Sequence, residues 1–148
     1  KMITTNKDDL LKKCENTTLK EGKEIIALLE KELENSALSG IGLAANQIGI
    51  NKNVCIIRID RFGRYDFINP VITKRTGYAV VEGEGCLSFP DQKVTTSRSN
   101  SVVVKDLLNP EGRTLKGVDA ICAQHEIDHL NGLTMFDRIL TTDEDNNA

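Results

Sequence analysis

Both histidines of this 148-residue chain lie in one stretch, Gly117 to Gly132, and their spacing is the strongest constraint in the sequence. His125 and His129 are four residues apart, and Glu126 directly follows the first of them. On an α-helix this spacing places both imidazoles on one face, where they reach a single metal ion, while Glu126 projects about 100° around the axis. The stretch predicts a metal-bearing helix of the H-E-x-x-H type found in metallohydrolases. The alternative is a helix with two surface histidines and a solvated glutamate.

Such a site needs a third protein ligand, and the chain offers few candidates. In the extended form H-E-x-x-H-x-x-G-x-x-H the third ligand falls six residues after the second histidine, and that position is Met135. The glutamate that remains after His129 is Glu144, which lies in a polar tail. Cys86 lies among glycines shortly before Pro90. A thiolate beside two neutral imidazoles suits a borderline-soft divalent ion and leaves a fourth position for water, whereas Cys86 taken alone is typical of a small apolar residue in a turn.

Cys122 keeps a second kind of site open. It lies three residues before His125, and with Cys86 and the two histidines it would complete a closed Cys2His2 zinc module without enzymatic activity. The chain has four cysteines and no C-x-x-C pair, and its N-terminus lacks the apolar core of a signal peptide. We therefore expect free thiols rather than disulfides.

The segment from Gly40 to Ile50 is rich in glycine and alanine and carries no charge. It reads G-I-G-L-A-A-N-Q-I-G-I, and it lacks the further glycine of a dinucleotide-binding fingerprint. A flexible loop between a helix and a strand is one interpretation. The other is an extended backbone beside a bound substrate, with Gln47 as an uncharged donor directed into the site.

Local signals predict helices near the N-terminus and strands in the middle of the chain. Asn6 is a candidate cap for a short helix that runs through Leu10, Leu11 and Cys14, and Thr18 and Glu21 form a capping-box pattern for a helix ending near Asn35. Apolar residues then recur at helical spacing, at Leu19, Ile25, Ile26, Leu29 and Leu33. The runs 54–59 and 65–68 predict a hairpin, and further strands are expected at 78–81 and 101–105.

These elements predict the α+β class, with antiparallel sheets packed around the metal-bearing helix. We expect one domain over residues 1–148, with a disordered acidic tail from about 141. Four residues on or near the helix are expected to be buried: Val118, Ile121, Cys122 and Leu130.

Charge and hydropathy exclude several classes of partner. The net charge is −3 and the lysines and arginines are scattered, so direct nucleic-acid binding is not expected. No apolar run approaches the roughly 18 residues needed to cross a bilayer, and a membrane partner is not expected either. We expect a cytoplasmic protein.

Three segments resemble the signature motifs of the peptide deformylases, in the same order along the chain. They are Gly40 to Gln47, Glu84 to Ser88, and Gln124 to Gly132. Arg98 and the residues from Gly117 to Ile121 also fall where this family has similar residues, so the resemblance covers roughly Leu10 to Arg138. It implies the removal of the formyl group from the N-terminal formyl-methionine of nascent peptides, with release of formate.

The resemblance also implies roles for individual residues. Cys86, His125 and His129 would hold one divalent ion, expected to be Fe²⁺, with Zn²⁺ or Ni²⁺ able to substitute, and the ion would lower the pKa of a bound water. Glu126 would be the general base. Donors for the developing oxyanion would be the Gln47 amide and the backbone N–H of Leu87.

By the same resemblance, the peptide substrate would add as a strand between the backbones of Gly42 and Gly85. Its methionine side chain would enter a pocket, and Glu84 and Arg98 complete the expected substrate-binding set. The pocket would be lined by Ile41, Val118, Ile121 and Cys122.

The expected partners are the formyl-methionyl peptide and, transiently, the ribosome. Only a short acidic tail follows Arg138, where many relatives continue into a further helix or strand, and this departure weighs against a docking role for a terminal helix while leaving open whether docking occurs without one. Two other functions remain as alternatives, a metallopeptidase of other specificity and the closed zinc module.

Overall fold

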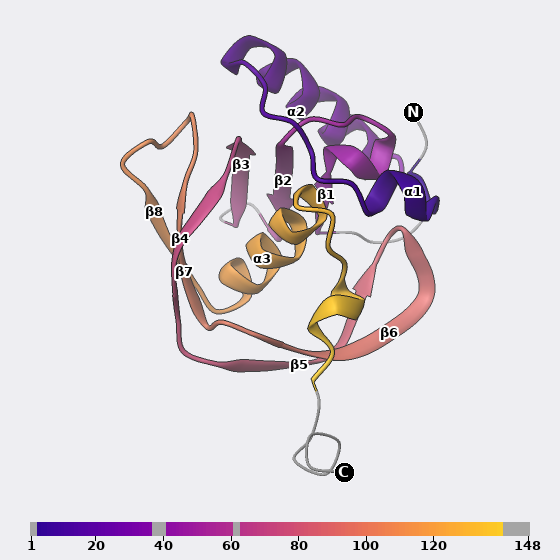
Figure 1. Cartoon of the computed structure of the whole chain (residues 1–148), viewed down its shortest axis with the longest axis vertical. Helices are drawn as coiled ribbons and strands as arrows, with labels where there is room; N and C mark the ends of the chain where they lie inside the picture. The colour runs from indigo at the N-terminus through magenta and orange to yellow at the C-terminus, as the bar shows by residue number, and fades with distance from the viewer. Residues whose placement is uncertain (1–2, 37–40, 61–62, 141–148) are drawn as a thin grey trace.

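The computed structural model describes residues 3–36, 41–60 and 63–140, and its centre is the predicted histidine-bearing helix. This helix is α3 (Val118–Leu130), and three antiparallel sheets surround it (Figure 1). The expected α+β class, with antiparallel sheets packed around a metal-bearing helix, is confirmed. The predicted tail from about residue 141 lies outside the described residues.

The first sheet separates α3 from the long N-terminal helix α2 (Leu19–Glu34) (Figure 1). It has the strand order β1 (Gly42–Ala44), β2 (Val54–Arg58), β3 (Arg64–Ile68). Strand β2 contacts both helices, and the run from Val54 to Ile57 is wholly buried. The continuous apolar sequence V-C-I-I is what a strand covered on both faces requires. The predicted hairpin at 54–59 and 65–68 is confirmed.

Helix α2 packs one apolar face on this sheet. Thr18 caps it, since the Thr18 hydroxyl accepts a hydrogen bond from the Glu21 N–H at 3.2 Å, and the helix ends before Asn35, both as predicted. The buried face holds Ile25, Ile26 and Leu29, whereas Leu19 is 43% exposed although it fits the helical spacing. The first helix, α1 (Lys7–Leu10), has the expected Asn6 cap but is shorter than predicted and ends before Leu11 and Cys14.

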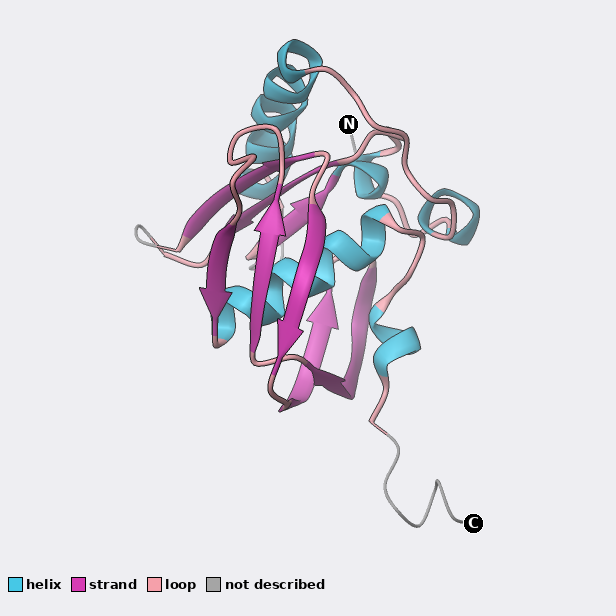
Figure 2. Cartoon of the chain, turned by 60° about the vertical axis from the view of Figure 1, so that its left-hand side comes forward, coloured by secondary structure: helices cyan, strands magenta, loops and turns pink. Residues whose placement is uncertain are grey.

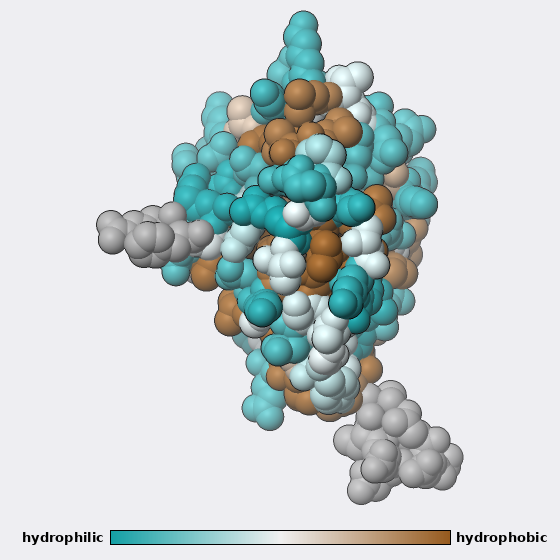
Figure 3. All heavy atoms as spheres, turned by 90° about the vertical axis from the view of Figure 1, so that its left-hand side faces the viewer, coloured by the Kyte–Doolittle hydropathy of each residue, from teal (hydrophilic) through white to brown (hydrophobic). Residues whose placement is uncertain are grey.

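Two further sheets enclose the other sides of α3. One has the order β4 (Val71–Thr76), β7 (Ser101–Lys105), β8 (Arg113–Lys116), and the other pairs β5 (Ala79–Cys86) with β6 (Phe89–Arg98). Figure 2 shows strands passing in front of α3, and the outer face seen in Figure 3 is mostly hydrophilic. The predicted strand at 101–105 is confirmed, and the one at 78–81 begins at Ala79 and extends to Cys86.

Strands β4, β6 and β8 are not indicated by the sequence patterns. β4 and β6 are largely exposed and polar, and β6 carries Pro90, Asp91, Gln92 and Lys93 near its start. Their pairing is decided by neighbouring strands rather than by their own propensity. Two 3₁₀ turns complete the fold: η1 (Ala45–Ile48) follows β1, and η2 (Met135–Arg138) follows α3. None of the helices within the described ranges has the length and apolarity to cross a membrane.

Candidate active site

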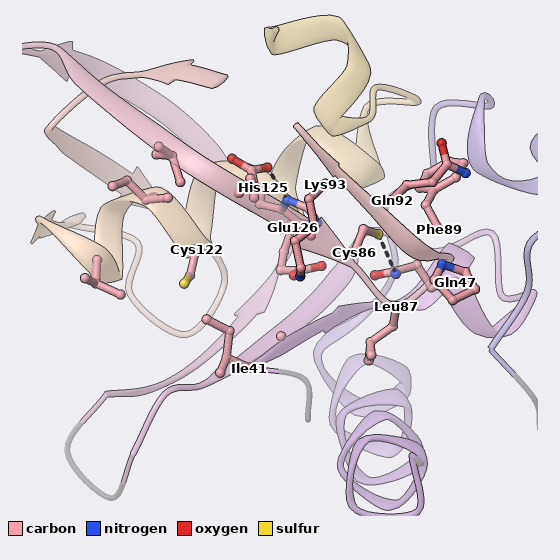
Figure 4. Close-up of a pocket in the computed structure, with 18 of the residues that line it drawn as sticks. Ile41, Gln47, Cys86, Leu87, Phe89, Gln92, Lys93, Cys122, His125 and Glu126 are labelled. Atoms are coloured by element: carbon pink, nitrogen blue, oxygen red, sulfur yellow. Dashed lines mark hydrogen bonds and ion pairs between the residues drawn. The ribbon is translucent and has the colours of Figure 1, made fainter. Parts of the chain in front are cut away.

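A cavity of about 590 Å³ opens between β1, β5, the start of β6 and α3 (Figure 4). Strand β5 ends at Cys86, so this cysteine reaches the cavity from a strand end, while His125 and Glu126 reach it from α3. The segments that carry the three sequence motifs thus converge, although nearly forty residues separate Cys86 from His125.

Cys86, His125 and His129 form the metal site. Their ligand atoms lie within 4.8 Å of one another, and Cys86 Sγ is 3.2 Å from His129 Nε2. One thiolate and two imidazoles are a donor set for a borderline-soft divalent ion with an open fourth position, so the residues fit a metal ion chemically as well as geometrically. Cys122 does not belong to this group within the described part of the chain, and the closed Cys2His2 alternative is therefore wrong. Figure 4 shows the two sulfurs at separate places in the cavity.

A carboxylate fixes the orientation of His125. Its Nδ1 donates to Glu84 Oε2 at 2.6 Å, which leaves Nε2 free to bind the ion, an arrangement common among metal-binding histidines. Arg98 holds Glu84 with two hydrogen bonds, from Nε to Oε1 at 2.8 Å and from Nη2 to Oε2 at 2.7 Å. Burial alone would raise the pKa of Glu84, but hydrogen bonds from Arg98 and His125 outweigh it and hold this pKa well below its ordinary value.

Burial also shifts the pKa values of the other central groups. It raises the pKa of Glu126 to about 7, against the opposing charges of His125 and Arg98. For His125, burial would lower the pKa, but the Glu126 carboxylate and hydrogen bonds with Cys86 and Glu84 raise it to about 10. Burial holds the pKa of His129 well below its usual value. These shifts describe the site without its ion, and an ion bound at Nε2 would displace any proton held there.

Glu126 faces the cavity with an unused acceptor. The residue is 5% exposed, and its Oε1 atom has no hydrogen-bond partner among the described residues. Gly42 lies directly against it, because a Cβ atom at this position would be 2.6 Å from Glu126 Oε2. A buried carboxylate oxygen without a donor beside a metal site is free to take a proton from a bound molecule.

The 3₁₀ turn η1 fixes the direction of the Gln47 amide. Its Oε1 accepts the Ala44 N–H at 2.9 Å, so Nε2 points toward Ser88 Oγ at 3.1 Å and Cys86 Sγ at 3.5 Å. The neighbouring Asn46 donates through Nδ2 to the backbone oxygen of His129 at 2.6 Å and ties the turn to α3. No role was predicted for Asn46 or Ser88. Asn46 belongs to no recognisable capping or metal-ligand pattern. Its hydrogen-bond partner, His129, lies 83 residues away, so no local signal points to this contact.

Known proteins resemble this chain in sequence and in fold. The model of the polypeptide deformylase family matches residues 1–145. The chain belongs to this family. It is 38% identical over 143 residues to the peptide deformylase of Natranaerobius thermophilus, covering 93% of this chain and 91% of that protein, and 38% identical over 146 residues to that of Pelagibacter ubique, covering 93% and 84%.

Solved structures of family members have the same fold. The peptide deformylase from Thermotoga maritima has a TM-score of 0.80 and 32% identity, covering 95% of this chain and 97% of the other. A class I type b peptide deformylase from Acinetobacter baumannii, solved with Met-Ala-Ser bound, has a TM-score of 0.78 and 26% identity, covering 94% and 97%. The protein is a peptide deformylase, a metallohydrolase that removes the N-formyl group from nascent peptides.

Most of the residues expected to bind substrate in this deformylase do line the large cavity. They are Ile41, Gly42, Glu84, Gly85, Val118, Ile121 and Cys122, together with Gln47 and Leu87. Val118 was expected to be buried, and this is wrong: it is 58% exposed, because the first residue of α3 faces the cavity rather than the core. Ile121 was also expected to be buried but is only half-buried, because it lines the same cavity. Cys122 and Leu130 are buried as expected.

Arg98 is the exception among the expected substrate-binding residues. Its side chain is 1% exposed, and it lies between Glu84 and Asp128. It lines a smaller polar cavity of about 230 Å³ instead of the one that contains Cys86. The start of β6 also lines the large cavity, at Phe89, Gln92 and Lys93, and this was not predicted (Figure 4). No pattern in this polar run indicates that it borders a site.

Proposed function

We propose that Glu126, Gln47 and Leu87 carry out the deformylation of formyl-methionyl peptides beside an ion held by Cys86, His125 and His129. The observation that supports this most directly is Glu126 itself, a cavity-lining carboxylate with an unpartnered Oε1, next to three converging ligand atoms. Burying an unpaired carboxylate oxygen costs free energy. A carboxylate kept in such a position is therefore expected to have a function.

The ion that we propose is Fe²⁺, by resemblance to the family, with Zn²⁺ or Ni²⁺ able to bind the same residues. When bound, it supplies a Lewis acid that lowers the pKa of a water molecule and polarises the formyl carbonyl. The protein supplies a thiolate from β5 and two imidazoles from α3, one of them oriented by Glu84.

Glu126 acts as the general base and then as the acid. Its carboxylate accepts a proton from the attacking water, and the water oxygen forms a bond to the formyl carbon. The same proton then passes to the amine nitrogen as the C–N bond breaks, giving formate and a peptide with a free amino group. A carboxyl whose pKa burial raises to about 7 suits both steps near neutral pH.

Gln47 and Leu87 stabilise the negative charge that develops on the formyl oxygen. The Gln47 amide has its oxygen occupied by the Ala44 N–H, so its NH₂ group is turned toward Cys86 before the substrate arrives. Leu87 directly follows Cys86, and its backbone N–H is the second donor. Donors oriented in advance are worth roughly 10²–10³-fold in rate.

The peptide binds as an added strand between β1 and β5. Gly42 and Gly85 line the cavity from these two strands and lack side chains that would hold a backbone away. The methionine side chain fits the apolar end of the cavity, at Ile41, Val118, Ile121 and Cys122. The Met-Ala-Ser complex of the Acinetobacter baumannii relative supports a peptide of this kind as ligand. On nascent chains the enzyme would work in the cytoplasm, in transient contact with the ribosome.

Paired substrates test this function. Formyl-Met-Ala and Met-Ala are each incubated with the metal-loaded protein, and formate and free amino acids are measured. We expect formate from the first peptide and no cleavage of the Met-Ala bond in either. Release of free alanine would instead indicate a peptidase.

The base assignment predicts that Glu126→Gln binds the ion as well as the original protein but loses about 10²–10⁴-fold in kcat, because an amide does not accept the water proton. The rate of formate release and the metal content per chain are measured together. A variant with a full complement of metal and near-normal kcat would refute the assignment of Glu126.

A further inference from the structure

A chain of buried charges leads from the metal ligand His125 to Arg138 at the surface. Its members alternate in sign: Glu84 is bonded to His125, Arg98 to Glu84, Asp128 to Arg98 and Arg138 to Asp128. Glu84, Arg98 and Asp128 are 8%, 5% and 1% exposed, so water does not screen these contacts. Arg138 is the member that reaches the surface, with a side chain 35% exposed.

Arg138 grips Asp128 with a two-point contact. Its Nε donates to Asp128 Oδ2 at 2.9 Å and its Nη2 to Oδ1 at 3.0 Å, while Arg98 Nη1 also donates to Oδ2 at 3.0 Å. A planar guanidinium matches a carboxylate in this way, and such pairs fix geometry as well as charge. Asp128 thus holds two arginines, and the one on its outer side comes from a separate element.

That element, η2, is fastened at both ends. At its start, the Thr134 hydroxyl accepts the Phe136 N–H at 3.3 Å and the Thr134 N–H donates to Asp137 Oδ2 at 2.9 Å. After its end, the Leu140 N–H donates to the Thr95 oxygen at 2.9 Å on β6. Arg138 is therefore held in place by the backbone and not only by Asp128.

Removing the outer arginine would change the inner contacts. The two buried carboxylates, Glu84 and Asp128, would then share the single guanidinium of Arg98. These three side chains together would carry one uncompensated negative charge. Arg98 would be drawn toward Asp128, whose Oδ1 would have lost its donor. Because Arg98 holds both oxygens of Glu84, and Glu84 holds His125, that shift would turn the imidazole that binds the ion.

We propose that Arg138 is a positioning residue for the metal ligand His125, acting through Asp128, Arg98 and Glu84. This inference rests on the metal site and function proposed above. Arg138 lines the smaller polar cavity together with Arg98 and Gln124, and it does not line the cavity that contains Cys86. Its effect should therefore fall on the ion and on kcat, and KM for the peptide should stay unchanged.

The test compares Arg138→Gln with Arg138→Lys. Affinity for Co²⁺ is measured by competition with a chelator, and the absorption spectrum of the bound Co²⁺ reports the thiolate and imidazole geometry. We expect Arg138→Gln to bind Co²⁺ about tenfold more weakly, because substituting a residue that supports a metal ligand typically costs about 10–100-fold in affinity. The absorption spectrum of the bound Co²⁺ should also shift. Arg138→Lys keeps the positive charge but cannot make the two-point contact with Asp128. It should recover part of the Co²⁺ affinity and part of the original spectrum.

Two controls separate positioning from general loss of stability. Arg64→Gln makes the same chemical change at an arginine that pairs with Glu30 on the surface, and Ile25→Val weakens the core between α2 and the first sheet. Neither should alter Co²⁺ affinity or its spectrum. Unchanged affinity and spectrum in a folded Arg138→Gln or Arg138→Lys, or an equal loss in the controls, would overturn the proposal. Failure of the original protein to bind Co²⁺ would instead count against the proposed metal site.

Discussion

At the scale of single residues, the absence of a side chain at Gly42 decides where Glu126 lies. A Cβ at Gly42 would come within 2.6 Å of the carboxylate, and real structures do not tolerate such a contact. The glycine therefore leaves room for the carboxylate on α3, besides the peptide backbone that we propose to bind beside it. The glycine-rich sequence predicts close approach of a peptide backbone, but nothing in the spacing of Gly42 and Glu126 shows that these two residues touch.

Gly42→Ala should displace Glu126 and lower kcat by about 10²-fold, the cost expected for a misplacement of about 1 Å. Metal content should be unchanged, because the three atoms nearest to the added Cβ all belong to Glu126, which is not one of the three ligands. Formate release and metal per chain are measured on the same preparation. Normal kcat would show that the contact yields without moving the carboxylate.

Cys122 offers a second prediction at this scale. Burial raises the pKa of its thiol to about 12, so it is protonated and a poor ligand, and it lies outside the group of converging ligand atoms. Cys122→Ser should retain one ion per chain, whereas Cys86→Ser should lose it. Metal analysis after dialysis distinguishes the two variants. Loss of the ion from Cys122→Ser would contradict this prediction and support the closed Cys2His2 site.

At the scale of elements, each helix has a different reason for its place. Helix α2 is amphipathic and follows from its cap and its apolar spacing, as predicted. Helix α3 is buried along most of its length, from Cys122 to Leu130, so its polar residues are enclosed and must find partners inside the protein. Those partners come from β5, β6 and η2.

A close contact also sets the distance between α2 and β3. A Cβ at Gly22 would lie 2.7 Å from two side-chain atoms of Ile68, which is fully buried. Alanine favours a helix by about 1 kcal/mol over glycine, but overpacking costs about 1–3 kcal/mol, so the second effect prevails. Gly22→Ala should lower the free energy of unfolding by about 1 kcal/mol and Tm by a few degrees.

The same substitution serves as the control for Gly42→Ala. Both add one methyl group against a neighbour closer than 3.0 Å, but Gly22 faces the core between α2 and the sheet. Thermal unfolding and kcat are compared for the two proteins. We expect Gly22→Ala to lose stability and keep kcat, and a loss of kcat there would mean that α2 packing controls the site.

At the scale of the whole molecule, the buried charges make stability depend on pH. The pKa of Glu84 lies below its ordinary value of 4.5 in the folded protein, because hydrogen bonds from Arg98 and His125 outweigh burial. A depressed carboxyl pKa contributes stability that is complete above the unfolded pKa and is lost as pH falls through the folded one. Acid should therefore weaken the contacts among β5, β6 and α3 below about pH 4.5.

Glu84→Gln tests this dependence. At pH 7 the variant should be less stable by about 3–5 kcal/mol, because Arg98 loses a buried partner, and the difference should shrink as pH falls below 4.5. Urea unfolding across this pH range, in the presence of chelator, gives both values. Glu30→Gln, at a surface ion pair, is the control, and a difference for Glu84→Gln that does not vary with pH would contradict the linkage.

The sequence by itself determined the family, the metal ligands, the class of fold and the helix that carries the histidines. These depend on spacing within one element, as at His125 and His129, or on motif order along the chain, as for Cys86. The tertiary structure alone decided that Gly42 abuts Glu126, that Asn46 holds the end of α3, and that Arg98 supports Glu84 from within instead of lining the substrate cavity. The physical reason is that these contacts join residues far apart in the chain, and their geometry is set by how sheets pack around α3 rather than by any local pattern.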